Sequence, residues 1–401
     1  MSLDVALLAV GALGVLVVFT SRLVRHLPIS EPLAALGLGV VLGPEVLALA
    51  DLDQGTVVLH AVSELGIAIA LMAVALRFPW DRVRDHVRPV LFMVTVGMVA
   101  MAAIVGGLAW WLLPITTSAA VIIGGALAPT DPVLSSSIVT GEPATDILPE
   151  RLRLMLSVES GVNDGLALPL VVAGVVLVHG DGFGRFATEG LLSVAIALVV
   201  GTLLGGAAGE LFRRLDEAHD IEDSAFFVFT LVLPLFVLGA VNLLHGDGIL
   251  AVFAAGLAYN RQVGSSIYDD EREVEEGVNR VLLLPLFALF GAVLPWAEWR
   301  SLGWAPLAAF AATVLLLRRL PVVLALKRQL GLGWAGTVVY GWFGPMGAAA
   351  LFFATLALEE HAASGVVWPA VAFVVACSTV VHGVTAAPLR AVYGKVSART
   401  G

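Results

Sequence analysis

Long apolar stretches alternate with short polar connections along almost the whole chain. Each stretch is about 20 residues long, and a helix of that length crosses the hydrocarbon core of a bilayer. The pattern therefore predicts an all-α polytopic membrane protein with about thirteen transmembrane helices. We expect them at 3–21, 29–49, 57–76, 88–113, 116–140, 150–178, 188–212, 224–245, 247–260, 278–296, 302–320, 335–357 and 364–389. The stretch 247–260 is short for a crossing, so a re-entrant or interfacial segment is an alternative there.

Composition agrees with a bilayer environment. The 401 residues are 59% hydrophobic and only 13% charged, about half the charged fraction of a typical soluble domain. The first stretch lacks a basic leader and a cleavage site, so we interpret it as a retained helix rather than a signal peptide. Much of the net charge of −10 sits in one acidic loop, 269–276, and nucleic acid is not an expected partner. The single Cys377 excludes a disulfide framework.

The basic residues test this layout, because Lys and Arg concentrate in cytoplasmic loops. With the N-terminus outside, 20 of the 22 Lys and Arg residues face inward, and only Arg185 and Arg300 face outward. Arg318 and Arg319 are counted inside, although they can also lie within span eleven. We expect a protein of the cell inner membrane with its N-terminus outside and its C-terminus in the cytoplasm.

An odd number of spans suggests an inverted repeat. We expect repeat one at 1–178, a connecting helix at 188–212 and repeat two at 224–389. Spans five and twelve then correspond, and each carries proline in its middle, at Ala128–Pro132 and Gly344–Gly347. Proline removes a backbone donor and clashes with the preceding turn. The pattern favours two crossed, discontinuous helices at a midplane ion site, with isolated helix kinks as the alternative.

Acidic residues inside predicted spans are the candidates for chemistry, because charge in the hydrocarbon core is costly. The five candidates are Glu64, Asp131, Glu159, Asp164 and Asp247.

Span six is the most informative of these segments. Glu159, Ser160, Asn163 and Asp164 lie within about 140° of one helix face. Their hard oxygen ligands suit a small cation such as Na⁺, whereas Zn or Cu prefers sulfur or imidazole. We expect Asp164, Ser160 and Asp131 as ligands of the monovalent metal ion.

A buried carboxylate also has the physics for exchange. Burial disfavours its charged form and so favours a proton, while a bound cation favours the ionised form. Proton and cation then compete at Asp164, and competition yields antiport if the site alternates its exposure. Asp131 can neutralise helix N-termini at the breaks, bind the ion, or do both. Glu64 is a further candidate for the ion site, with a position near the outer surface as the alternative.

Other chemistry finds no support in the sequence. The eight His residues show no ligand spacing, and His382 within span thirteen is interpreted as a core residue. P-loop, GxSxG and HExxH motifs are absent from the sequence. We therefore expect a transporter rather than an enzyme, with no cofactor besides the transported Na⁺ or similar cation and H⁺.

Four segments together resemble the sodium/proton exchangers of the cation:proton antiporter superfamily. The first runs from Glu31–Leu33 to Gly39–Pro44, resembling a Pro-Leu … Gly-x-x-x-Gly-Pro segment. Thr130–Pro132 is similar to that family's Thr-Asp-Pro break. Glu159–Gly165 is similar to its Glu-Ser-x-x-Asn-Asp-Gly helix, and Gly246–Leu257 to its short ninth span. Their common order and spacing make the resemblance specific.

The resemblance implies a homodimer of thirteen-helix protomers with a mobile six-helix core and elevator-like alternating access. It implies a site around Asp164, with Ser160, Asn163, Asp131 and Thr130 alongside. Asn rather than Asp at position 163 matches the electroneutral branch, and pH homeostasis is the implied role. The chain stops at Gly401, so we expect no C-terminal regulatory domain.

Two departures from the family pattern bear on the site. Relatives pair the residue matching Glu159 with a basic residue of the second broken helix, where this chain has Phe343 or Met346. Either that pair is lost, leaving Glu159 unpaired, or Arg318 or Arg319 replaces the missing partner. Asp247 stands where Ser is commoner in the family.

Three alternatives stay open. The same ligands permit K⁺/H⁺ antiport, because a sequence does not set cavity size. A passive cation channel would show a carbonyl filter or charged rings, which the paired breaks disfavour. The third alternative is a relative that has lost transport, and the missing basic residue is the reason to consider it.

Overall fold

A computed structural model describes residues 11, 15, 30–48, 55–77, 80–132, 134–135, 147–218, 223–263, 283–363 and 365–400. Every regular element within these ranges is helical, which confirms the predicted all-α class for the described chain. Nearly all of predicted span one and the acidic loop at 269–276 lie outside the described residues.

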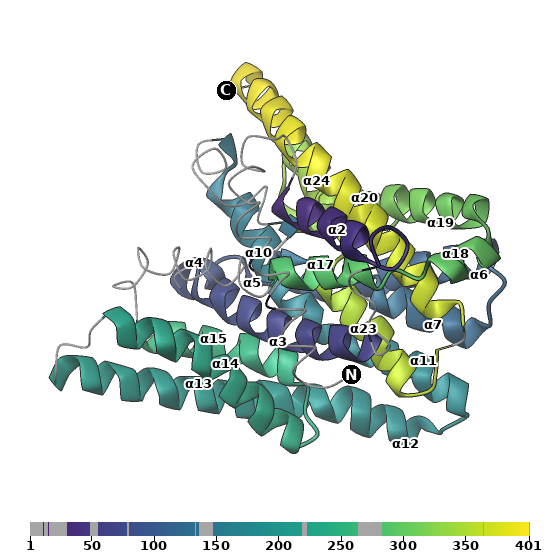
Figure 1. The fold of residues 1–401 in the computed structure, drawn as a ribbon. Helices are drawn as coiled ribbons and strands as arrows, with labels where there is room; N and C mark the ends of the chain where they lie inside the picture. Colours follow the sequence, from purple (N-terminus) through teal and green to yellow (C-terminus); the bar gives the residue numbers. More distant parts are fainter. Residues whose placement is uncertain are drawn as a thin grey trace.

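The helices are labelled as in Figure 1. Those of the first half are α2 (Glu31–Leu42), α3 (Gly55–Leu76), α4 (Trp80–Arg84), α5 (Val87–Phe92), the π-helical η1 (Met93–Gly97), α6 (Met98–Leu112), α7 (Thr117–Ala126), α10 (Glu150–Leu166) and α11 (Leu168–His179). Those of the second half are α12 (Phe183–Arg185), the π-helical η2 (Phe186–Leu192), α13 (Ser193–Ala218), α14 (Asp223–Leu243), α15 (Gly248–Val263), α17 (Leu284–Ala292), α18 (Trp296–Leu302), α19 (Trp304–Leu317), α20 (Leu320–Ala325), α21 (Lys327–Leu330), α22 (Trp334–Trp342), α23 (Ala348–Glu359) and α24 (Val367–Thr400).

Helix lengths agree with repeated membrane crossing. Six described helical stretches are long and apolar enough to cross a bilayer, and four shorter apolar helices accompany them. Each predicted span from the second to the thirteenth contains a described helix, while the total of thirteen stays a prediction. Two helical stretches outrun their predicted spans, because α12 to α13 covers 183–218 and α24 reaches Thr400. The apolar pattern stops where a bilayer would end, whereas helical hydrogen bonds continue into polar sequence.

Small residues bring α13 and α15 into close contact, and the two run side by side in Figure 1. A Cβ added at Gly201 would lie 2.4 Å from the Ala251 carbonyl oxygen, and one at Gly205 would lie 2.0 Å from that of Ala255. The glycines recur every four residues, which places them on one helix face. Close backbone approach through small residues is the usual means of packing helices within a bilayer.

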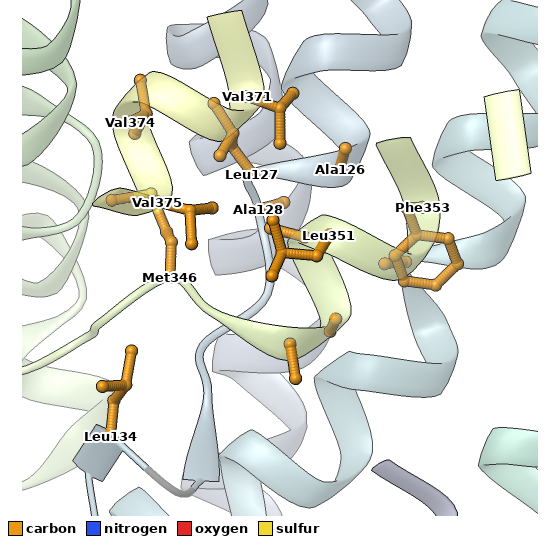
Figure 2. Packing of buried hydrophobic residues seen from close by; sticks show 14 of the residues in the cluster. Ala126, Leu127, Ala128, Leu134, Met346, Leu351, Phe353, Val371, Val374 and Val375 are labelled. Atoms are coloured by element: carbon orange, nitrogen blue, oxygen red, sulfur yellow. The ribbon is translucent and has the colours of Figure 1, made fainter. Parts of the chain in front are cut away.

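Both predicted helix breaks are present, and they touch each other. The α7 helix ends at Ala126 before the non-helical stretch 127–131, and the stretch 343–347 separates α22 from α23. The Asp131 backbone N–H donates to the Pro345 carbonyl at 2.8 Å. Figure 2 shows Met346 of the second break beside Val375 of α24, within one buried apolar cluster. The breaks therefore form a polar contact enclosed by apolar packing.

Candidate ion-binding site

The polar residues of α10 form one buried stripe. Glu159, Ser160, Asn163 and Asp164 each expose at most 1% of their surface. Their spacing places them on one face of the helix, as the sequence predicts. Because an isolated polar group is costly to bury, the contacts of each side chain decide what it can do.

Thr130 in the first break is hydrogen-bonded to two residues of this stripe. Its backbone N–H donates to Asn163 Oδ1 at 3.2 Å, and Asn163 Nδ2 donates to its hydroxyl at 2.9 Å. The Thr130 and Ser160 hydroxyls lie 3.0 Å apart, and Ser160 donates to the Leu156 carbonyl at 2.9 Å. Since the Ser160 proton is directed to Leu156, Thr130 is the donor between the two hydroxyls. Break and stripe thus form one hydrogen-bonded unit.

Asp131 accepts hydrogen bonds from backbone N–H groups that follow each of the two breaks. Its Oδ1 accepts from the Leu134 backbone N–H at 2.8 Å, and its Oδ2 accepts from the Ala348 backbone N–H at 2.5 Å. Ala348 is the first residue of α23. A Cβ at Gly347 would lie 2.2 Å from Asp131 Oδ2, so only glycine permits this approach. A carboxylate in this place stabilises the positive ends of helices.

Arg318 occupies the complementary place at the ends of the segments that precede the breaks. Its Nη1 donates to the carbonyls of Leu127, Ala128 and Pro129 at 2.7, 3.1 and 2.9 Å. Its Nη2 donates to the Gly344 carbonyl. A guanidinium there satisfies carbonyls that have lost their helical partners and stabilises the negative helix ends. The sequence did not predict this contact.

Glu159 is fully partnered. Arg319 donates from Nη1 to Glu159 Oε1 at 2.5 Å and from Nη2 to Oε2 at 2.7 Å. The Tyr340 hydroxyl also donates to Oε2, and the Arg319 guanidinium lies 4.7 Å from the centre of the Tyr340 ring. Of the two outcomes left open for Glu159, the unpaired carboxylate is therefore wrong, because Arg319 supplies the basic partner.

Of the two placements considered for Arg318 and Arg319, the structure supports the one within span eleven and not the inward-facing loop. Each is 2% exposed, and they lie at a helix interruption between α19 and α20. Pro321 two residues later is the sequence signal for this interruption, because the residue before proline is disfavoured in helices. Phe343 and Met346 are buried apolar residues, and the missing base is replaced from another helix.

Asp164 contrasts with its neighbours. Both of its carboxylate oxygens are buried without a hydrogen-bond partner among the described residues. Asp131 belongs to the same part of the molecule, because its neighbour Thr130 is hydrogen-bonded to Asn163, the residue before Asp164. Buried polar atoms without partners are rare, so the Asp164 carboxylate is a candidate for binding a proton or a cation.

Glu64 and Asp247 lie outside this hydrogen-bonded unit. Glu64 on α3 is half-buried and accepts a hydrogen bond from Asn242 Nδ2 at 2.8 Å. Asp247 precedes α15 and is 4% exposed. Its Oδ1 accepts from the Leu250 backbone N–H at 2.9 Å, while its Oδ2 is buried without a partner among the described residues.

Sequence reasoning also missed side chains that hold the second break. Ser378 on α24 accepts a hydrogen bond from the Met346 backbone N–H at 2.8 Å. His382, one turn later, is 4% exposed and lies 3.2 Å from the Trp342 carbonyl through Nε2. His382 is thus a partnered core residue, as its interpretation from the sequence had it. Polar positions at i and i+4 on a buried helix were the available signal.

The side chains that could bind an ion at this site carry hydroxyl, carboxylate and amide groups. The described residues hold no group of three or more His, Cys, Asp or Glu side chains that could bind a metal ion. The site therefore offers a few hydroxyl, amide and carboxylate oxygens, which suit a weakly held hard cation.

Interrupted helices that meet around buried carboxylates define a multi-pass membrane protein with a polar site inside its helix bundle. Residues 13–391 match the family described as sodium/hydrogen exchanger, transmembrane, and the chain belongs to that family.

Individual relatives and one solved structure agree with this assignment. The chain is 27% identical over 398 residues to the Na(+)/H(+) antiporter 2 of Zygosaccharomyces rouxii, covering 90% of this chain and 49% of the relative. It is 26% identical over 295 residues to the K(+)/H(+) antiporter NhaP2 of Shewanella oneidensis, covering 74% of this chain and 50% of the relative. The chain thus spans about half the length of these relatives.

The solved structure is that of the sodium proton antiporter MjNhaP1 from Methanocaldococcus jannaschii at pH 8. It matches with a TM-score of 0.75 and 20% identity, covering 98% of this chain and 99% of that one. The fold of the described chain is therefore that of a known antiporter structure along nearly its whole length.

Proposed function

We propose that the chain is a secondary active antiporter that exchanges a monovalent cation, Na⁺ or Li⁺, for protons. The observation that carries this proposal is the Asp164 carboxylate, which is 1% exposed with both oxygens unpartnered among the described residues. A carboxylate in this condition needs either a proton or a cation, because burial strongly disfavours an isolated charge. Proton and cation therefore compete at one site.

The groups around Asp164 have distinct roles in this proposal. Ser160, Asn163 and Thr130 supply or orient oxygen ligands through their hydrogen-bonded chain. Asp131 neutralises the positive helix ends, and in this proposal its carboxylate also contributes to cation binding. When a proton replaces a cation at Asp164, the other charged side chains of the site keep their charges, because each of them has its own hydrogen-bond partners.

Two arginines complete the charge balance. Arg318 holds the negative helix ends at the breaks, and Arg319 neutralises Glu159. Neither arginine donates to Asp164 among the described contacts, so its charge stays available for the transported ions. Asp164 is then the single exchangeable carboxylate of the unit, which supports one proton per cation and electroneutral exchange.

The remaining features of the proposal extend from the family resemblance and the charge pattern. The chain works as a homodimer in the cell inner membrane, with the N-terminus outside and the C-terminus inside. Its two repeats, at 1–178 and 224–389, flank the connecting helix 188–212, and a core including the two crossed breaks moves in an elevator-like step. Without the buried Arg318 and Arg319, 18 Lys and Arg residues are still predicted to face inward and two outward, and this distribution supports the orientation.

The test is proton flux in proteoliposomes that contain a pH-sensitive dye, with the membrane potential clamped. After a pH gradient is imposed, Na⁺, Li⁺, K⁺ or choline is added in turn. We expect dye recovery on Na⁺ or Li⁺, no recovery on choline, and no recovery by D164N. A large ion current without proton exchange would indicate a channel, and folded protein inactive with every cation would contradict transport.

K⁺/H⁺ antiport is the second candidate. It is favoured by the similarity to a relative named as a K(+)/H(+) antiporter, and the oxygen ligands of the site permit either ion. Recovery of the dye on K⁺ to the same extent as on Na⁺ would establish this alternative in the same experiment.

A further inference from the structure

Unpartnered buried carboxylate oxygens occur at two residues of the described chain. Both oxygens of Asp164 and the Oδ2 of Asp247 have this property. Asp247 Oδ1 already serves the first turn of α15 by accepting from Leu250, so helix capping accounts for one oxygen and leaves the other. Buried acceptors without a protein partner are rare in folded proteins, so this oxygen is a candidate for binding a ligand.

The two carboxylates belong to helices in direct contact. A Cβ at Gly165, the residue after Asp164, would lie 2.9 Å from the Leu250 backbone nitrogen. That same nitrogen donates to Asp247 Oδ1 at 2.9 Å. One turn away, a Cβ at Gly161 would lie 2.3 Å from the Phe253 ring. The Asp247 carboxylate is thus separated from the backbone beside Asp164 by a single amide group.

A second set of contacts leads from Asp247 toward the surface. Gly248 follows Asp247, and a Cβ there would lie 2.3 Å from Asn242 Oδ1. Asn242 Nδ2 in turn donates to Glu64 Oε1 at 2.8 Å. We call Glu64, Asn242 and Asp247 the polar trail.

Exposure differs between the outer and inner residues of this trail. Asn242 is exposed, Glu64 is half-buried, Asp247 is 4% exposed and Asp164 is 1% exposed. Two segments far apart in sequence contribute to it, because Glu64 lies on α3, whereas Asn242 on α14 and Asp247 just before α15 follow one another in the chain. Carboxylate and amide oxygens are ligands for hard cations, and the negative charge of the two carboxylates raises the local cation concentration.

We propose that the polar trail is an access route for monovalent cations, with Asp247 as its inner binding station before Asp164. This inference rests on the proposed function of Asp164 as the exchange site. The route serves one face of the membrane, the face at which Asn242 is exposed. The ion moves from the Glu64 and Asn242 oxygens to Asp247 Oδ2 and then to Asp164.

The test compares D247N with wild type in membrane vesicles of both orientations, with Na⁺ added from one face at a time. We expect the half-saturating Na⁺ concentration from the Asn242 face to rise by about threefold to tenfold, and that from the opposite face to stay unchanged. The difference in exchange rate between D247N and wild type should become smaller as the Na⁺ concentration is raised. D247S provides a second variant, because serine preserves the helix cap should D247N fold poorly.

A matched control is E298Q, which removes one exposed carboxylate away from the trail, on α18, and should leave both half-saturating values unchanged. Wild-type values from both faces in D247N and D247S would overturn the trail, while an inactive D164N in the same vesicles would leave the proposed function standing. Equal shifts from both faces would also overturn it, because a one-sided route cannot produce them. Wild-type exchange by D164N would instead overturn the proposed function.

Discussion

Two buried carboxylates on one helix have opposite surroundings. Glu159 and Asp164 lie five residues apart on α10, and each is 1% exposed. Glu159 accepts hydrogen bonds from both nitrogens of an arginine fork and from a tyrosine hydroxyl, whereas Asp164 has no partner among the described residues. Burial alone therefore does not identify a functional carboxylate.

The difference teaches how charge is divided inside a bilayer protein. A bidentate Arg319–Glu159 pair is neutral as a unit, and its geometry satisfies both partners. Removing either partner leaves an uncompensated buried charge. Asp164 has no such compensation, so the transported cation or a proton must provide it. One carboxylate stabilises the fold, and the other is available for exchange.

The largest expected effect comes from exchanging the two carboxylates for their amides. D164N should abolish cation-driven proton flux and leave thermal stability equal to or above that of wild type, because a buried unpartnered charge is removed. E159Q should lower the melting temperature in detergent, because it leaves Arg319 without its counter-charge. An equal loss of stability in D164N and E159Q would contradict the proposed difference between the two carboxylates.

The next effect concerns the basic partner. R319M should destabilise the protein by about 3–5 kcal/mol, the usual cost of breaking a buried ion pair from one side. The double variant E159M/R319M should recover most of that loss, because no charge stays buried without a partner. Thermal unfolding of purified protein measures both. A double variant as unstable as R319M would show that the pair is not the source of the stability.

Packing beside Asp164 should produce a smaller loss. In G165A the new methyl group would meet the Leu250 backbone and Cβ at 2.4–2.9 Å, so α10 and α15 must separate. Overpacking of this kind costs about 1–3 kcal/mol. G107A is the matched control, because a Cβ at Gly107 meets nothing within 4 Å. Melting temperatures that fall equally in both variants would contradict the close contact.

The hydroxyl chain should affect affinity more than stability. S160A removes an oxygen that contacts Thr130 at 3.0 Å, and we expect the half-saturating Na⁺ concentration to rise by about threefold to tenfold. S157A, one turn earlier on the same helix, removes a hydroxyl that contacts Arg77 instead. Dye-recovery rates over a range of Na⁺ concentrations give the half-saturating value of each variant. Equal shifts of this value in S160A and S157A would show that Ser160 is not part of the ion site.

The smallest effect belongs to an exposed ion pair, which contrasts with the buried Glu159 pair. Arg300 Nη2 donates to Glu45 Oε1 at 2.8 Å beyond the end of α2, and this contact lowers the pKa of Glu45 below its ordinary value of 4.5. A lowered pKa contributes stability above 4.5 that is lost as pH falls through the folded value. E45Q should therefore change thermal stability only slightly at neutral pH and not at all at strongly acidic pH, with screening by salt.

The spans, the two breaks and the polar stripe were predictable from sequence because each is a local pattern. Apolar length predicts a crossing, proline in an apolar run predicts an interruption, and polar residues at helical spacing predict one face. The breaks at 128–132 and 344–347 and the stripe at 159–164 are present where these patterns put them. The C-terminal ends of α13 and α24 were not predicted, because these helices continue past their apolar stretches.

The partners of the stripe were not predictable in the same way. Arg319 lies 160 residues from Glu159 in the chain, and Tyr340 lies 181 residues away. The sequence placed Arg318 and Arg319 in a loop or a span and left open which of them replaces the missing base. Arg318 instead donates to carbonyls at both breaks, a contact that requires the two breaks to meet.

The sequence by itself determined a helical membrane protein with two interrupted spans and an oxygen-rich stripe at 159–164, because hydrophobic length, proline and helical periodicity act within a few residues. Only the tertiary structure decided that Glu159 is neutralised, that Asp164 keeps both oxygens free of described partners, and that Asp247 lies one amide away from the backbone beside it. The physical reason is that neutralisation depends on which distant side chain lies within hydrogen-bond distance, and packing of the whole bundle decides that distance.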